Sequence, residues 1–295
     1  MKIAVCLYGQ AGGTVKTDKG IKDISPADSY NNYKDVLFKD LDVDFFIHSW
    51  SEDYKDELLE LYEPKKYIIE GQRDFSGYSL KDYSLDHINT YKSIFTSTMA
   101  DKNGVIIDLN NDVKNFLTEQ YIFNTHSRWF STSRSIGLMV EYAKSKNIEY
   151  DWVLQLRMDL YFRESFPFRS LNPSSFYACP RFSVDKDFAV NDIWFLSNQK
   201  NAVFFSKIYE NIFDYSIWPH SAAKQHIDSF GASIDFYPEV RHGRKNYWLK
   251  RELLIQENIQ EITFYKRLAQ SVLQRMLNYT HSFEGLLRKV ISKLS

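Results

Sequence analysis

Three apolar runs, separated by polar segments, constrain the fold of this chain most strongly. The runs are KIAVCLYG (2–9), VDFFIHSW (43–50) and KKYIIEG (65–71), and each is long enough for one buried strand. The segment SYNNYKDVLFKDL between the first two has helical potential. Alternating strands and helices form a parallel sheet flanked by helices, in which ligands bind beyond the carboxyl ends of the strands. We therefore expect an α/β fold.

The second half of the chain continues this pattern. The segment FNTHSRWFSTSRSIGLMVEYAKSKN predicts a helix capped by Ser131 or Thr132, which leads into a buried strand at 150–162. The segments SSFYACPRF and NDIWFLSN predict two more strands, followed by an amphipathic helix at 199–215. These strands complete a Rossmann-type mixed sheet in one domain, which we expect to span residues 1–260.

The last residues of the chain differ in composition. Residues 262–295 place apolar side chains at helical spacing and carry six Lys and Arg residues against a single acid, Glu284. We expect a basic amphipathic helical tail over 261–295. It either lies on an anionic membrane surface or packs against the domain or a second subunit, as in a homodimer.

Charge and cysteine usage exclude several classes of protein. The 37 Lys and Arg residues are balanced by 38 Asp and Glu residues, which argues against a surface built for polyanions, so no nucleic-acid partner is expected. Cys6 and Cys179 lack neighbours at metal-ligand spacing and suggest neither a disulfide framework nor a zinc site. The first residues are too short an apolar stretch for a signal peptide, and no run approaches a membrane span. We expect a cytoplasmic protein.

Two charged residues interrupt the apolar run YDWVLQLRMDLYF. In an extended strand, Arg157 and Asp159 point to the same side and can act on one ligand. A carboxylate at a strand exit can hold a divalent cation that neutralises a diphosphate leaving group, and the arginine can grip a phosphate. The alternative is that Arg157 and Asp159 pair only with each other, because an unpaired charge at the end of a buried strand is costly.

Four segments resemble bacterial surface-polysaccharide glycosyltransferases, the capsular and lipopolysaccharide sugar transferases of the WavE-like kind. They are AVCLYGQ, DFFIHSW, STSRSIGLMVEYAKSKNIEYDWVLQLRMDLYF and NDIWFLSN, in the expected order over roughly residues 1–200. In these proteins an Arg-x-Asp strand end occupies the place of the Asp-x-Asp motif of GT-A folds.

The resemblance implies a GT-A-like sheet that binds a nucleotide sugar, with a divalent metal, Mn or Mg, held by Asp159. It implies transfer of a sugar from a nucleoside-diphosphate sugar to a capsule or lipopolysaccharide glycan. The acceptor would be a glycan or lipid-linked glycan, with possible peripheral contact at the cytoplasmic face of the inner membrane. The alternatives are transfer of another activated group to such glycans and a non-catalytic nucleotide- or carbohydrate-binding module.

The loop after the first strand departs from the relatives, which often carry an arginine there. This chain has GQAGGTVK, with Lys16 as the nearest cation. Tyr8, Gly9 and Gln10 at the strand end are expected to contact the donor nucleotide, and Gly-rich backbone can approach a phosphate. A surface loop without a ligand is the alternative.

Three further residues are candidates on separate elements. His48 would lie at the carboxyl edge of the sheet and bind the base or ribose, unless it is a core histidine. Arg134, at the start of its expected helix, would reach a pyrophosphate, or face solvent instead. Asp192 precedes an apolar strand, and the resemblance makes it the catalytic base or a donor-sugar ligand. An Asx turn is the alternative for Asp192, and Asp185 and Asp187 compete for its role.

The segment EVRHGRKNYWLKR concentrates positive charge around aromatic residues. Arg241 and Arg244 suit a diphosphate, because several donors can converge on two phosphates. The resemblance implies that His242 completes the metal shell, as a C-terminal histidine does in some GT-A enzymes.

Overall fold

The computed structural model describes residues 1–17, 20–84, 111–179, 189–237 and 247–249. The chain divides into two units, residues 1–12 with 25–248, and residues 13–24 with 249–295. In the second unit the structure describes an antiparallel hairpin of β2 (Gly13–Thr17) and β3 (Gly20–Ile24). The expected tail at 261–295 lies outside the described residues. Within the described part of the chain, no helix is both long and apolar enough to cross a membrane.

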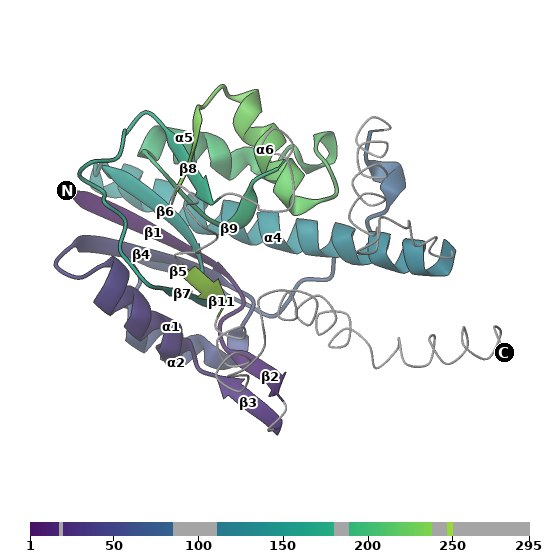
Figure 1. Cartoon of the computed structure of the whole chain (residues 1–295), viewed down its shortest axis with the longest axis horizontal. Helices are drawn as coiled ribbons and strands as arrows, with labels where there is room; N and C mark the ends of the chain where they lie inside the picture. The colour runs from purple at the N-terminus through teal and green to yellow at the C-terminus, as the bar shows by residue number, and fades with distance from the viewer. Residues whose placement is uncertain (18–19, 85–110, 180–188, 238–246, 250–295) are drawn as a thin grey trace, which may run out of the picture. The chain divides into compact units, whose positions relative to one another are not determined.

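The first unit is built around a seven-stranded, mostly parallel sheet, which confirms the expected α/β class (Figure 1). In spatial order its strands are β5 (Lys66–Ile69), β4 (Asp42–Ser49), β1 (Lys2–Gly9), β6 (Trp152–Arg157), β9 (Asn191–Ser197), β8 (Phe176–Cys179) and β10 (Ile234–Phe236). Only β9 runs antiparallel to its neighbours, so the sheet is mixed. A short β7 (Leu160–Phe162) pairs separately with β11 (Tyr247–Leu249).

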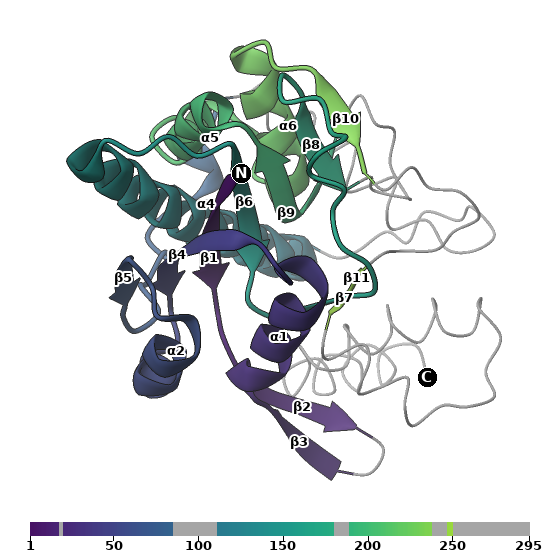
Figure 2. The ribbon, with the colours of Figure 1, turned by 90° about the vertical axis from the view of Figure 1, so that its left-hand side faces the viewer.

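Helices cover both faces of this sheet, so β1 is buried almost throughout (Figures 1 and 2). Two successive residues of β4 show the two layers. Phe46 packs against Tyr142 of α4 (Asn111–Lys146), whereas Phe45 packs against Tyr62 of α2 (Lys55–Tyr62). The α4 layer also holds α5 (Gln199–Phe205) and α6 (Pro219–Ser229), and α1 (Pro26–Asn32) contacts α2 on the other side.

Short helical turns complete the first unit. A π-helical turn follows α1 at Tyr33–Leu37, and 3₁₀ turns lie at Glu52–Tyr54, Leu80–Asp82, Ser206–Ile208 and Ile212–Asp214. The prediction of one helix over 199–215 is therefore wrong for its second half. α5 ends at Phe205, and the chain continues in two separate 3₁₀ turns.

The expected start of the long helix is also wrong. α4 begins at Asn111, so Ser131 and Thr132 lie in its interior and do not cap it. Both side chains are fully buried and use their hydroxyls elsewhere. The Ser131 hydroxyl accepts a hydrogen bond from the Gly9 amide, and the Thr132 hydroxyl donates to the Arg128 carbonyl four residues earlier.

Candidate functional site

The carboxyl ends of β1 and β6 form the candidate site. From β1 the chain proceeds to β4 on one side, and after β5 it returns through α4 to β6 on the other side. Such a reversal of strand order opens a crevice beyond the carboxyl edge, which is where ligands bind in open α/β sheets. Tyr8 and Arg157 are paired across β1 and β6 at this edge.

Arg157 and Asp159 form a two-bonded ion pair at this edge. The Arg157 Nε donates to Asp159 Oδ1 at 2.8 Å and Nη2 donates to Oδ2 at 2.6 Å. The two side chains are 29% and 21% exposed, so both reach the surface. Burial alone would lower the pKa of Arg157, but the attraction and hydrogen bonds of Asp159 outweigh it and raise the pKa.

The backbone around this pair differs from the expected continuous strand. β6 ends at Arg157, and Asp159 lies in the turn that leads to β7, so the carboxylate folds back onto the guanidinium. Tyr33 fixes the turn, because its hydroxyl donates to the Arg157 carbonyl at 2.6 Å and accepts from the Leu160 amide at 3.0 Å. The same-side prediction for the two residues was right in outcome, although alternation along a strand is not its cause.

Tyr8 and Arg128 form the buried floor beside the pair. The Tyr8 hydroxyl donates to the Ile193 carbonyl at 2.6 Å and accepts from Arg128 Nη2 at 2.6 Å, and its side chain is 1% exposed. The guanidinium lies 3.7 Å from the centre of the Tyr8 ring. Burial lowers the pKa of Arg128 and raises that of Tyr8. Tyr8 therefore positions Arg128 and β9 at this edge.

Asp192 belongs to the same cluster of charges. Because β9 is antiparallel, its first residues lie at the carboxyl edge of β6. The Asp192 carboxylate lies 3.1 Å from Nδ1 of His220 and 3.6 Å from Nε of Arg128. Arg128 also donates from Nε and Nη2 to the Asp192 carbonyl. Asp192 is thus held by two neighbours, inside β9, and is not the first residue of an Asx turn.

His48 lies at the carboxyl edge as predicted, paired with Tyr8 across β4 and β1, whereas Arg134 lies on α4. His48 is fully buried, with Nδ1 2.8 Å from the Ser131 hydroxyl and Nε2 3.2 Å from Glu70. Burial lowers its pKa to about 4, against which the hydrogen bond of Glu70 acts. Both ring nitrogens are used within the protein, as in a core histidine. Arg134 is exposed on α4, in the helix interior and not at the expected helix start.

The loop after β1 has free space around Gly9, but the amides of Gly9 and Ala11 already donate hydrogen bonds within the protein. Gly9 has a φ of 91°, and a side chain there would meet no atom within 4 Å. Its amide donates to Ser131, and its carbonyl accepts from the Trp50 amide. The Ala11 amide donates to the Ser51 hydroxyl. Gln10 between them is exposed, so its side chain is accessible to solvent.

Several predicted site residues cannot be placed. Arg241, His242 and Arg244 lie outside the described residues, as do Asp185 and Asp187. The side chain of Lys16 also lies outside them.

The described residues do not fit a divalent metal. Both carboxylate oxygens of Asp159 accept from Arg157, and the second carboxylate of the cluster, Asp192, faces His220 and Arg128. In the described ranges, no group of three or more His, Cys, Asp or Glu side chains has the arrangement of a metal site. Metal binding at Asp159 and His242 stays a prediction of the resemblance.

Sequence reasoning missed Arg128, His220 and Tyr33. Arg128 had a detectable signal, because it precedes Thr132 by four residues and so lies on the same helical face as this buried hydroxyl. The late helix start that was expected hid this relation. His220 and Tyr33 come from α6 and the π-helical turn, and only the tertiary fold brings them to the edge.

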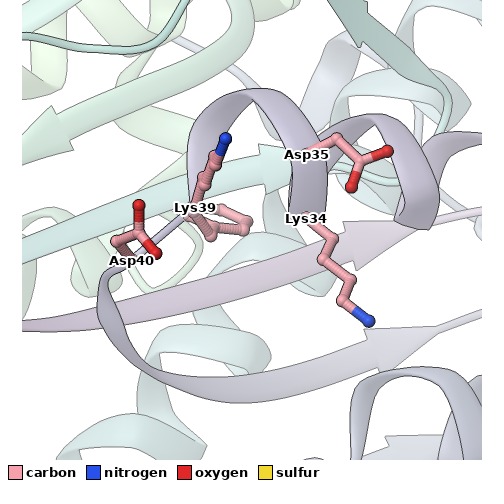
Figure 3. Close-up of a pocket in the computed structure, with 5 residues that line it drawn as sticks. Lys34, Asp35, Lys39 and Asp40 are labelled. Carbon is pink, nitrogen blue, oxygen red and sulfur yellow. The ribbon is translucent and has the colours of Figure 1, made fainter.

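Two hollows of the described surface lie away from this edge. One of about 390 Å³ is lined by Lys34, Asp35, Phe38, Lys39 and Asp40, just before the amino end of β4 (Figure 3). Another of about 390 Å³ involves Met1, Asp151 and Trp152 at the amino ends of β1 and β6. Ligands of α/β sheets bind at the opposite edge, so we place the site by its charged side chains.

The sequence matches no protein-family model and shows no significant similarity to a curated protein.

Proposed function

We propose that the protein is a glycosyltransferase that moves a sugar from a nucleoside-diphosphate sugar to a bacterial surface glycan of a capsule or lipopolysaccharide. The observation that carries this proposal is the Arg157–Asp159 pair, partly exposed at the carboxyl edge where the strand order reverses. The four segments that resemble sugar transferases supply the substrate class. Two of them cover most of β1 and β4, the third contains β6, and the fourth contains β9.

The site offers the two groups that such a transfer needs. The leaving diphosphate carries negative charge that the Arg157 guanidinium can bind with two parallel hydrogen bonds. Asp192, held by His220, is the proposed base that takes the proton of the acceptor hydroxyl. A lipid-linked glycan and contact with the inner membrane through the basic tail remain part of the proposal. The Mn or Mg that the resemblance implies, with Asp159 and His242 as ligands, is not needed for this proposal, because both oxygens of Asp159 already accept from Arg157.

A thermal-shift screen of nucleoside diphosphates and their sugar conjugates tests the proposal. A ligand that binds only the native state at ~100 times its Kd adds about 2.7 kcal/mol to the free energy of unfolding. We expect conjugates of one base to raise the Tm of the wild type and not that of Arg157→Lys. Arg169→Lys, which changes an exposed arginine near the amino ends of the strands, is the matched control and should keep the shift. No shift with any nucleotide would contradict the proposal.

A second candidate is a non-catalytic nucleotide- or carbohydrate-binding module. The observation that favours it is that Asp159 already pairs with Arg157, as an internal pair would. Chromatography of the stabilising conjugate, incubated with the protein and surface-glycan fragments, separates the candidates. The transferase releases nucleoside diphosphate on addition of glycan, whereas the module returns the conjugate intact.

A further inference from the structure

We propose that Arg157 binds the diphosphate at this edge without a divalent cation, and that Asp159 is a positioning residue for the guanidinium and not a metal ligand. The inference rests on the proposed function for the identity of the nucleotide. The anion site itself follows from the contacts of Arg157 and Asp159, and pyrophosphate can probe it alone.

The first argument is how the Asp159 oxygens are used. Nε and Nη2 of Arg157 lie 2.8 and 2.6 Å from the two oxygens, which is the parallel two-bond geometry of a strong guanidinium–carboxylate pair. A cation that took either oxygen would replace one of these charge-assisted bonds. It would also place a dication beside the guanidinium that the carboxylate now compensates.

The second argument is the charge of the surroundings. Arg128 has an 11% exposed side chain and contributes a second fixed positive charge next to Tyr8. Asp192 is the second carboxylate of the cluster, and one of its oxygens lies 3.6 Å from Nε of Arg128. Two guanidiniums therefore balance two carboxylates. Each of these carboxylates is thus compensated and gains little from a dication, whereas the remaining N–H donors of Arg157 are already held in place for an anion.

The third argument is the remaining capacity of Arg157. A guanidinium has five N–H donors, and Asp159 takes two of them. In the part of the chain that the structure describes, no other acceptor bonds to this guanidinium, and the side chain is 29% exposed. Phosphate oxygens can thus bind Nη1 and the second Nη2 proton while Asp159 keeps the plane of the group fixed.

The two roles of Asp159 predict opposite results for one variant. As a metal ligand, Asp159→Asn would weaken diphosphate binding and abolish its dependence on metal. As a positioning residue, Asn still offers an oxygen to Nε, and loss of the negative charge removes repulsion of the phosphates. We therefore expect Asp159→Asn to bind diphosphate as tightly as the wild type or more tightly.

Isothermal titration of the full chain tests this, with inorganic pyrophosphate and with a panel of nucleoside diphosphates, in EDTA and in Mn²⁺. We expect binding in EDTA that Mn²⁺ tightens by no more than about twofold, and a loss of about tenfold or more in Arg157→Lys, since lysine lacks the planar fork. Asp42→Asn, an exposed carboxylate at the other edge, is the control for a change of charge, and unfolding curves verify that each variant folds.

Binding that requires Mn²⁺ and is lost in Asp159→Asn would overturn the inference and leave the proposed function standing. Binding of pyrophosphate in EDTA without any nucleoside diphosphate would support the anion site and count against the nucleotide-sugar function. Absence of binding by every probe would overturn the inference.

Discussion

At the scale of single residues, Tyr8 links the first strand to the charges of the candidate site. Its hydroxyl uses its proton for the Ile193 carbonyl and its lone pair for Arg128. Both hydrogen bonds are buried, so losing either one costs free energy that water does not restore. The side chain that sequence reasoning assigned to nucleotide contact is therefore a support for Arg128 in the observed arrangement.

Replacing this hydroxyl should destabilise the fold. We expect Tyr8→Phe to lower the free energy of unfolding by about 1–3 kcal/mol, because a buried carbonyl and a buried guanidinium each lose a partner. Urea unfolding measures the change. Tyr67→Phe, at a tyrosine that is 44% exposed, should change stability by less than about 0.5 kcal/mol. Equal, small effects at both positions would contradict the supporting role of Tyr8.

Residue types alone predicted part of this site. Arg157 and Asp159 stood out because two charges interrupt an apolar strand, and the pairing considered as the alternative is the one observed. The partners of Tyr8 and Asp192 could not be predicted in this way. Arg128 and His220 come from α4 and α6, and contacts between distant segments are set by how helices pack on the sheet.

At the scale of elements, α4 shows where periodicity fails as a guide. The helix spans 36 residues, and the expected start at Ser131 or Thr132 rested on their capping tendency. Hydroxyl side chains cap helices because they form hydrogen bonds with backbone groups. For the same reason, a hydroxyl in the interior of a helix can accept a hydrogen bond from a backbone amide at the end of a neighbouring strand. Ser131 does this through the Gly9 amide.

The strands were easier to predict than the helices. β1, β4 and β6 are buried on both faces, so each reads as a continuous apolar run in the sequence. The turn after β6 was not predicted, because this two-residue turn at Met158 and Asp159 is anchored by the hydroxyl of Tyr33, which is more than 120 residues away in the sequence. Local sequence does not contain that contact.

At the scale of the whole molecule, three buried histidines couple stability to pH. His48, His126 and His226 have fully or almost fully buried side chains, and burial lowers the pKa of each to about 4. In the unfolded chain each histidine takes up a proton near its ordinary value of 6.5. Between these values the unfolded state binds more protons, so acid favours unfolding.

We therefore expect full histidine-dependent stability above about pH 6.5 and a fall as the pH decreases toward about 4. Each histidine contributes a slope of about 1.4 kcal/mol per pH unit in the middle of this range. Urea unfolding as a function of pH measures the slope. His226→Asn, which keeps a polar atom near the Tyr215 hydroxyl, should remove about one third of it. Stability that stays constant or rises on acidification would contradict this account.

The overall fold follows from the sequence more completely than the site does. Alternation of apolar runs and helical segments is a long-range pattern that many residues share, so single errors do not change the predicted class. A site depends on a few atoms brought together from four or more elements, as Arg157, Arg128, Asp192 and His220 are. Its geometry emerges only when the sheet order is known.

Hydrogen–deuterium exchange, with and without the nucleoside diphosphate that gives the largest thermal shift, tests the location of the site most directly. We predict slower exchange at amides 8–12 and 157–162, at the carboxyl ends of β1 and β6, and unchanged exchange at 34–40 around the hollow before β4. Slower exchange confined to 34–40 or to the amino ends of the strands, at saturating ligand, would contradict the assignment of the site to the Arg157 edge.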